Sequence, residues 1–260
     1  SLWGIDSHGI ARVTHYLTRL ENGTINKTPK LGFTKTAGAT GQMEGDDGHG
    51  IVIMTAATNH AIGMAREAGV GVVGVSNSSH CGAIGLYSRQ VTDAGMVGIS
   101  FTHADALVVP AGGYKPFFGT NPISIAFPTE NNDEPICLDM ATSIVPWNYM
   151  MNAKREKTVV PLGLGVDKDG KDSTNADEIV ALKPIADYKG YALAFMIDML
   201  CGPLNGMNFG PNMTSMYKDL HKKRKLGSLV LAIDPARFGG RDTIRMAGTA
   251  IINQVRTHGD

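Results

Sequence analysis

The stretch Ala68-Gly69-Val70-Gly71-Val72-Val73-Gly74-Val75, at positions 68–75, decides which fold this chain can adopt. Its glycines match the G-x-G-x-x-G pattern of dinucleotide-binding folds, in which a strand comes before the glycines and a helix follows them. Here the order is reversed, because helical spacing runs from Thr55 to Ala68, ahead of the glycines. We therefore interpret Gly69 as a helix end and Val70 to Val75 as a buried strand, outside the common dinucleotide fold.

Helices and strands alternate along the rest of the chain. The elements that we expect are, in chain order, a helix over 87–94, strands over 97–102, 123–127 and 136–139, an exposed excursion over 161–177, a helix over 189–200 and a strand over 229–233. This alternation predicts the α/β class. We expect a helical substrate-side segment over residues 1–40 and an α/β cofactor-binding core over 41–260, both cut from a longer chain.

Composition narrows the class of protein. Lysine plus arginine equals aspartate plus glutamate at 24 each, so no overall field attracts nucleic acid or an anionic membrane surface. Three scattered cysteines without a Cys-x-x-Cys pair argue against a disulfide framework and indicate a reducing compartment, which we take to be the cytoplasm. No apolar run reaches the roughly 18 residues of a membrane span, and no His-Glu-x-x-His motif predicts a metal site. The expected partner is a small molecule.

The N-terminal segment gathers polar side chains on one helical face. Apolar residues at helical spacing predict a helix that ends at Asn22-Gly23, namely Ile10, Val13, Leu17 and Leu20. His8, Arg12 and Tyr16 fall four residues apart on the opposite side. Arg12 could grip a carboxylate through two parallel hydrogen bonds, although a solvated helix face explains it equally well.

His80 is a second candidate for proton transfer. Like His8, it follows a serine and precedes a small residue, and it lies in the loop after the Val70 to Val75 strand. Histidine suits the role of general base because its ordinary pKa lies near working pH. A surface or structural role is the alternative for each histidine taken alone.

Two further segments could contact a cofactor. Asp139-Met140-Ala141-Thr142 ends a strand and offers a carboxylate, a hydroxyl and backbone amides to a ribose or phosphate. Lys189 opens a helix, where a cation opposes the helix dipole, so it is either placed for an anion or is an ordinary surface lysine. The basic run His221 to Lys225 is interpreted as a solvated turn.

Seven motifs, in order and approximate spacing, resemble the type-2 malate/L-lactate dehydrogenase family. They are Asp6-Ser7-His8-Gly9-Ile10-Ala11-Arg12, Asn77-Ser78-Ser79-His80-Cys81-Gly82-Ala83, Pro110-Ala111-Gly112-Gly113, Gly119-Thr120-Asn121-Pro122, Leu138-Asp139-Met140-Ala141-Thr142, Val166-Asp167-Lys168-Asp169-Gly170 and Lys189-Gly190-Tyr191. The resemblance covers nearly the whole chain. It implies a non-Rossmann α/β fold with a mixed sheet, and a homodimer with its active site near the subunit interface.

The same resemblance assigns roles to residues. His80 resembles the acid/base histidine, a role that some members give to the histidine matching His8, so both stay open as catalytic residues. The substrate pocket is implied to include Ser7, His8, Arg12 and Tyr16. The implied cofactor contacts are Ile84, Asp139, Met140, Ala141, Thr142 and Lys189.

The resemblance also implies a substrate and a cofactor. We expect hydride transfer between NAD and a small 2-hydroxy acid. Malate/oxaloacetate is the first candidate, and ureidoglycolate or L-lactate are the alternatives. Thr214 to Tyr217 and Trp147 most resemble members acting on ureidoglycolate. Asn148-Tyr149 replaces the Gly-Lys of many members, which favours NAD over NADP. The alternatives from other classes are a catalytically inactive nucleotide-binding regulatory protein and a structural protein; the joint presence of His8, Arg12, His80 and Lys189 disfavours the first.

Overall fold

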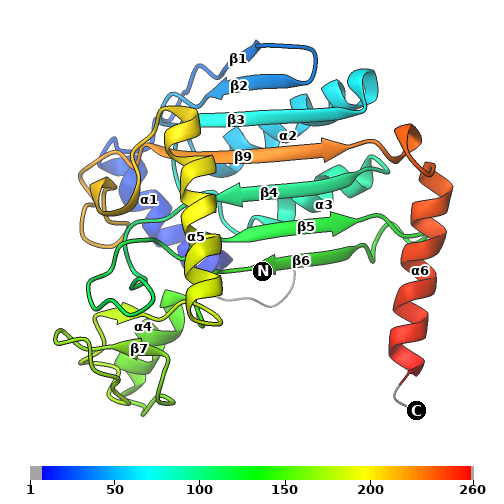
Figure 1. The fold of residues 1–260 in the computed structure, drawn as a ribbon. Coiled ribbons are helices and arrows are strands. Elements are labelled where there is room, and N and C mark those ends of the chain that lie inside the picture. The colour runs from blue at the N-terminus through cyan, green and yellow to red at the C-terminus, as the bar shows by residue number, and fades with distance from the viewer. Residues whose placement is uncertain (1–7, 259–260) are drawn as a thin grey trace.

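The structure, a computed structural model, describes residues 8–258 and folds them around one seven-stranded sheet (Figure 1). Its strand order is β1-β2-β3-β9-β4-β5-β6. The strands are β1 (Gly32–Lys35), β2 (Thr40–Glu44), β3 (Val70–Ser78), β4 (Val97–Thr102), β5 (Ile123–Phe127), β6 (Ile136–Met140) and β9 (Leu226–Ile233). β2 and β3 pair in parallel, whereas the other neighbours pair antiparallel. The predicted α/β class with a mixed sheet is confirmed.

The glycines of the deciding stretch serve a helix end and a close helix–strand contact. Helix α2 (Gly50–Ala68) ends at Gly69, which has a left-handed φ of 86° and donates its N–H to Ala65. A Cβ on Gly71 would come within 2.0 Å of the carbonyl oxygen of Ala61, so only glycine lets β3 lie this close to α2. The glycines lead directly into β3 and not into a helix. Their interpretation as a helix end and part of a buried strand is therefore confirmed.

Helices cover both faces of the sheet. α2 and α3 (Gly85–Asp93) lie behind it in the view of Figure 1, and α5 (Tyr188–Cys201) crosses the front. The main core lies under α2 and α3, where fully buried side chains meet: Ile53, Met54, Ala57, Ala61, Val73, Val75, Val91, Val230 and Ala232. The candidate site is built at the ends of β3, β4 and β6.

Several elements were not predicted. They are β1, β2, α4 (Trp147–Glu156), α6 (Arg241–Thr257), the two-stranded sheet of β7 (Gly165–Val166) and β8 (Ala181–Leu182), and the short 3-10 helices η2 (Ile10–Arg12), η3 (Pro203–Asn205), η4 (Gly210–Asn212) and η5 (Pro235–Arg237). The excursion over 161–177 is not wholly exposed, because Val166 and Ala176 are buried in small cores beside the main one. β1 pairs with β2 inside the main sheet, and the division of the chain at residue 40 stays a prediction.

Helix α1 (Val13–Glu21) forms where the spacing predicts it, with its polar side turned toward the body of the protein. Arg12 and Arg19 are buried, whereas Ile10, Val13 and Leu17 are exposed. An amphipathic surface helix normally does the opposite. Within residues 8–258, no helix is both long and apolar enough to cross a membrane.

Candidate active site

A cavity of about 280 Å³ opens where the start of the described chain meets the ends of β3, β4 and β6. Seven of the predicted site residues line it, namely His8, Arg12, His80, Ile84, Asp139, Met140 and Ala141. Other walls come from Asp105, Trp147, Asn148, Met216 and Tyr217. The fold therefore brings together residues from segments that lie far apart in the sequence.

His80 lies in the loop between β3 and α3, and Tyr16 of α1 fixes its ring. The Tyr16 hydroxyl oxygen is 2.7 Å from Nδ1 of His80, and the backbone N–H of Gly82 donates to the same nitrogen at 3.4 Å. Nδ1 is thus occupied by two neighbouring groups of the folded protein. Nε2 is therefore the nitrogen left to exchange a proton with a substrate.

Both histidines of the cavity are neutral at physiological pH. Burial, followed by the neighbouring His8 and Arg12, lowers the pKa of His80 well below 6.5. The ring of His8 stacks on that of His80 with centroids 5.5 Å apart, and burial together with Arg12 lowers the pKa of His8 to about 4. A buried neutral imidazole is the form that can accept a proton from an alcohol.

Arg12 lies in the same cavity, held by two elements distant in sequence. Its Nη2 is 3.4 Å from Oδ1 of Asn148, at the start of α4, and 3.4 Å from the hydroxyl oxygen of Tyr217. The guanidinium carbon also lies 5.7 Å from the centroid of the Tyr217 ring. These contacts set a planar, permanently charged group beside the two histidines, which suits the binding of a carboxylate.

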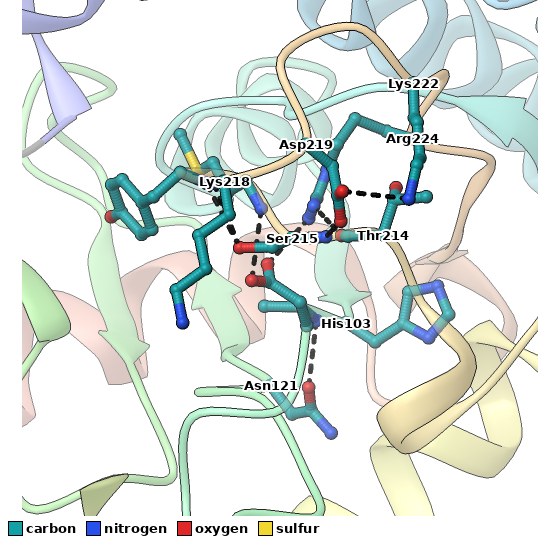
Figure 2. Close-up of polar contacts among 12 residues, drawn as sticks. His103, Asn121, Thr214, Ser215, Lys218, Asp219, Lys222 and Arg224 are labelled. Carbon is teal, nitrogen blue, oxygen red and sulfur yellow. Dashed lines mark hydrogen bonds and ion pairs between the residues drawn. The ribbon is translucent and has the colours of Figure 1, made fainter. Parts of the chain in front are cut away.

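Tyr217 belongs to a loop that buried arginines hold against the rest of the protein through hydrogen bonds. Residues 214–225 are called the 214–225 loop. Within it, Nη2 of Arg224 is 2.9 Å from Oδ1 of Asp105. Arg224 also donates to the carbonyl of Thr214. The other carboxylate oxygen of Asp105 accepts the N–H of Met216 at 3.1 Å. Figure 2 shows Arg224, Thr214, Ser215 and Asp219 gathered at the base of this loop.

Helix α1 holds the 214–225 loop from the opposite side. Arg19, only 1% exposed, donates to the carbonyls of Ser215, Met216 and Lys222. The basic run His221 to Lys225 is solvated only in part: residues 221–223 are exposed, as expected, but the end of the run is not. Arg224 is buried, and Lys223 and Lys225 both pair with Asp47, at 2.8 and 3.0 Å.

The other side of the cavity is formed by the end of β6 and the start of α3. Asp139 accepts the N–H of Gly85 at 2.9 Å, and burial raises its pKa although this hydrogen bond acts in the opposite direction. Met140, Ala141 and the buried Ile84 add apolar surface beside this carboxylate. The Asp139 carboxylate is thus a hydrogen-bond acceptor beside an apolar surface.

Three predicted site residues lie elsewhere or outside the described part. Thr142 is buried, and its hydroxyl donates to the carbonyls of Thr120 and Asn121, which ties β6 to the 119–122 turn. Lys189 is exposed in the first turn of α5 and is not among the lining residues. Ser7 lies outside the described residues. The roles of all three stay predictions.

Sequence reasoning gave no role to Asp105, Trp147 or Tyr217. Asp105 had a usable signal, since it follows the end of β4 much as Asp139 ends β6, and polar residues at strand ends commonly form sites. Trp147 and Tyr217 stood out only by their resemblance to members acting on ureidoglycolate, because only the fold carries α4 and the 214–225 loop to Arg12. His49 is a further neighbour, its ring centroid 4.4 Å from that of Tyr16. No group of three or more potential metal ligands lies together within residues 8–258.

Known proteins resemble this chain over most of its length. The family model described as malate/L-lactate dehydrogenase matches residues 1–260. Ureidoglycolate dehydrogenase (NAD(+)) of Escherichia coli O157:H7 is 39% identical over 242 residues, covering 93% of this chain and 69% of the relative. Malate dehydrogenase of Pyrococcus abyssi is 31% identical over 265 residues, covering 98% and 72%. The structure of sulfolactate dehydrogenase from Methanocaldococcus jannaschii superposes with a TM-score of 0.89 at 34% identity, covering 98% and 73%.

The fold and the cavity thus define a hydroxy acid dehydrogenase. The chain belongs to the malate/L-lactate dehydrogenase family. The predicted family and the non-Rossmann fold that it implies are confirmed.

Proposed function

We propose that this protein is an NAD-dependent dehydrogenase that interconverts a small 2-hydroxy acid and its 2-keto acid. One observation carries the proposal: a partly buried neutral histidine, His80, has one nitrogen occupied by Tyr16 and lies in the same cavity as Arg12. Oxidation of such an acid needs a base for the hydroxyl proton and a cation for the carboxylate, and these two residues supply them.

The hydrogen bond between Tyr16 and His80 serves both directions of the reaction. In reduction, the His80 imidazolium can give its Nε2 proton to the carbonyl oxygen of a keto acid and return to the neutral ring. During oxidation the hydroxyl proton goes to Nε2, which requires that Nδ1 carry the other proton and donate it to the Tyr16 oxygen. His8, stacked on His80 and next to Arg12, orients the carboxylate end of the substrate.

The side chains opposite Arg12 fit a nicotinamide cofactor. Ile84, Met140 and Ala141 provide apolar surface for a flat ring, and the Asp139 carboxylate can accept a hydrogen bond from a ribose hydroxyl. When bound, the cofactor supplies the hydride acceptor. Lys189 and Thr142 remain proposed contributors to cofactor binding.

NAD is the proposed cofactor, although relatives named for NAD and for NADP both occur. The support for NAD is Asn148-Tyr149, since a 2′-phosphate needs a cation of its own and this segment offers none. The side chain of Asn148, where many members have Gly-Lys, faces Arg12.

Malate and ureidoglycolate are the two substrates to compare. Malate is the prediction from the sequence. Ureidoglycolate is favoured by the 39% identity to an enzyme named for it. L-lactate is a third candidate. We also propose a homodimer, on family resemblance alone, and a cytoplasmic location, from the cysteine pattern.

Nicotinamide absorbance tests the proposal. Each 2-hydroxy acid is supplied with NAD and with NADP, and the His60→Ala variant, altered at an exposed histidine on α2, serves as a control. We expect turnover with NAD, a higher specificity constant for NAD than for NADP, and no change in the control. Cofactor binding without turnover of any of these acids would instead indicate the inactive regulatory protein.

A further inference from the structure

The cavity is poor in positive charge. Of the side chains that line it within residues 8–258, only Arg12 is a lysine or arginine, while Asp105 and Asp139 are carboxylates. His8 and His80 have lowered pKa values and add no charge at pH 7. Arg224 lies nearby, but its charge is balanced by Asp105 at 2.9 Å. The described cavity thus has one cation to offer to one carboxylate.

Two neutral polar side chains flank that cation. The amide oxygen of Asn148 and the hydroxyl oxygen of Tyr217 both accept hydrogen bonds from Arg12. Since these oxygens are used as acceptors, the amide nitrogen of Asn148 and the hydroxyl proton of Tyr217 are the donors that can turn to a ligand. Two neutral donors beside one cation suit a ligand with a carboxylate at one end and an uncharged carbonyl at the other.

A second carboxylate would fit this surface less well. Pro146, Trp147 and Met216 line the same cavity and displace water from whatever lies against them. Desolvating a charge without a counter-charge is much more costly than desolvating an amide that keeps its hydrogen bonds. An amide carbonyl presents the same acceptor oxygen with no net charge.

We propose, on the basis of the proposed function, that Asn148 and Tyr217 determine the substrate specificity. They select 2-hydroxy acids whose end distal to the reacting carboxylate is an uncharged amide-type group, either a carboxamide or a ureido group. Arg12 then binds the carboxylate next to the reacting carbon. Asn148 and Tyr217 donate to the carbonyl of the distal group.

A pair of substrates of equal shape isolates the charge of the distal group. Malate carries a carboxylate there, and malate β-amide carries a carbamoyl group of nearly the same size. The specificity constants of both, with NAD, are measured for the wild-type protein and for Asn148→Leu. The control is Asn152→Leu, one turn further along α4 and not among the lining residues.

We expect the wild-type protein to favour the amide over malate by at least about tenfold, and Asn148→Leu to reduce that ratio by about tenfold, the scale of one lost hydrogen bond to a buried polar group. Asn152→Leu should keep the wild-type ratio. Tyr217→Phe, with Tyr149→Phe as its control at an exposed position, repeats the test if Asn148→Leu does not fold.

The possible results separate this inference from the proposed function. A preference for malate, or an unchanged ratio in folded Asn148→Leu, would overturn the specificity role and leave the dehydrogenase in place. No turnover of any 2-hydroxy acid would overturn both. Calorimetric binding of malate and its amide gives the same comparison without turnover, and equal affinities would count against the inference.

Discussion

Helices α1 and α2 pack onto the same body with opposite faces. α2 places Ile53, Met54 and Ala57 against β3 and β9, all three 0% exposed, and turns polar residues to solvent. α1 buries Arg12 and Arg19 and leaves Leu17 53% exposed. The two helices therefore stabilise the fold by different means.

In α2 the stabilisation comes from removing apolar surface from water. In α1 it comes from hydrogen bonds, since Arg19 donates to three carbonyls of the 214–225 loop and to Nε2 of His15. Burial, with Arg19 as the next cause, lowers the pKa of His15 to about 4, so that His15 remains a neutral acceptor. A polar inner face brings Arg12 to the cavity and Tyr16 to His80, which an apolar inner face could not do.

The largest expected effect is at His80, whose ring is held by a hydrogen bond with Tyr16 of α1. Replacing His80 by alanine removes the group that exchanges the proton, so kcat should fall by about a hundredfold or more, the usual scale for a positioned acid/base. His60→Ala is the matched control on α2 and should leave kcat unchanged. Steady-state kinetics measure both, and equal kcat values for wild type and His80→Ala would reject the assignment.

A change on the inner face of α2 should affect stability and spare the chemistry. Ile53→Ala removes a fully buried side chain from the main core, and about 2–5 kcal/mol of unfolding free energy should be lost. Val52→Ala, at the neighbouring exposed position, should change it by less than about 0.5 kcal/mol. Denaturant unfolding gives both values. The contrast between the helices would fail if Ile53→Ala lowered kcat of the folded protein as strongly as His80→Ala does.

A smaller change on α1 should act on the substrate alone. Arg12→Lys keeps the charge and loses the planar fork, so the substrate KM should rise by about tenfold, the scale of one to two kcal/mol of binding energy. The KM for NAD should change much less. Initial rates with each ligand varied in turn provide the comparison, and an equal rise in both values would mean that Arg12 does not specifically bind the carboxylate.

The sequence predicted the elements around β3 because local rules and packing agree there. Helical spacing before Gly69 and a valine-rich run after it both point to one arrangement, and β4 and β5 were predicted with the bounds observed. β1 and β2 were missed because their patterns are short and mixed, and α6 was missed although its apolar residues recur at helical spacing. β2 is defined by its pairing with β3, which no local pattern specifies.

The candidate site was predicted in part for similar reasons. His8, Arg12 and Tyr16 lie at helical spacing, so their shared face follows from the sequence, and the structure adds His80 to them. That this face is buried does not follow, because it depends on Arg19 and the 214–225 loop meeting across nearly the whole chain. Tyr217 contacts Arg12 only through that tertiary contact.

The pH dependence of kcat/KM for oxidation tests the central claim, that His80 is the neutral base of the site, most directly. Because the pKa of His80 is lowered, protonation should remove activity only well below pH 6.5, and the rate should be level above that pH. The account predicts that His8→Ala keeps this acidic limb and that the residual activity of His80→Ala lacks it, with thermal melting confirming folded protein at each pH. A limb that is lost in His8→Ala and kept in His80→Ala would contradict the account and transfer the role of base to His8.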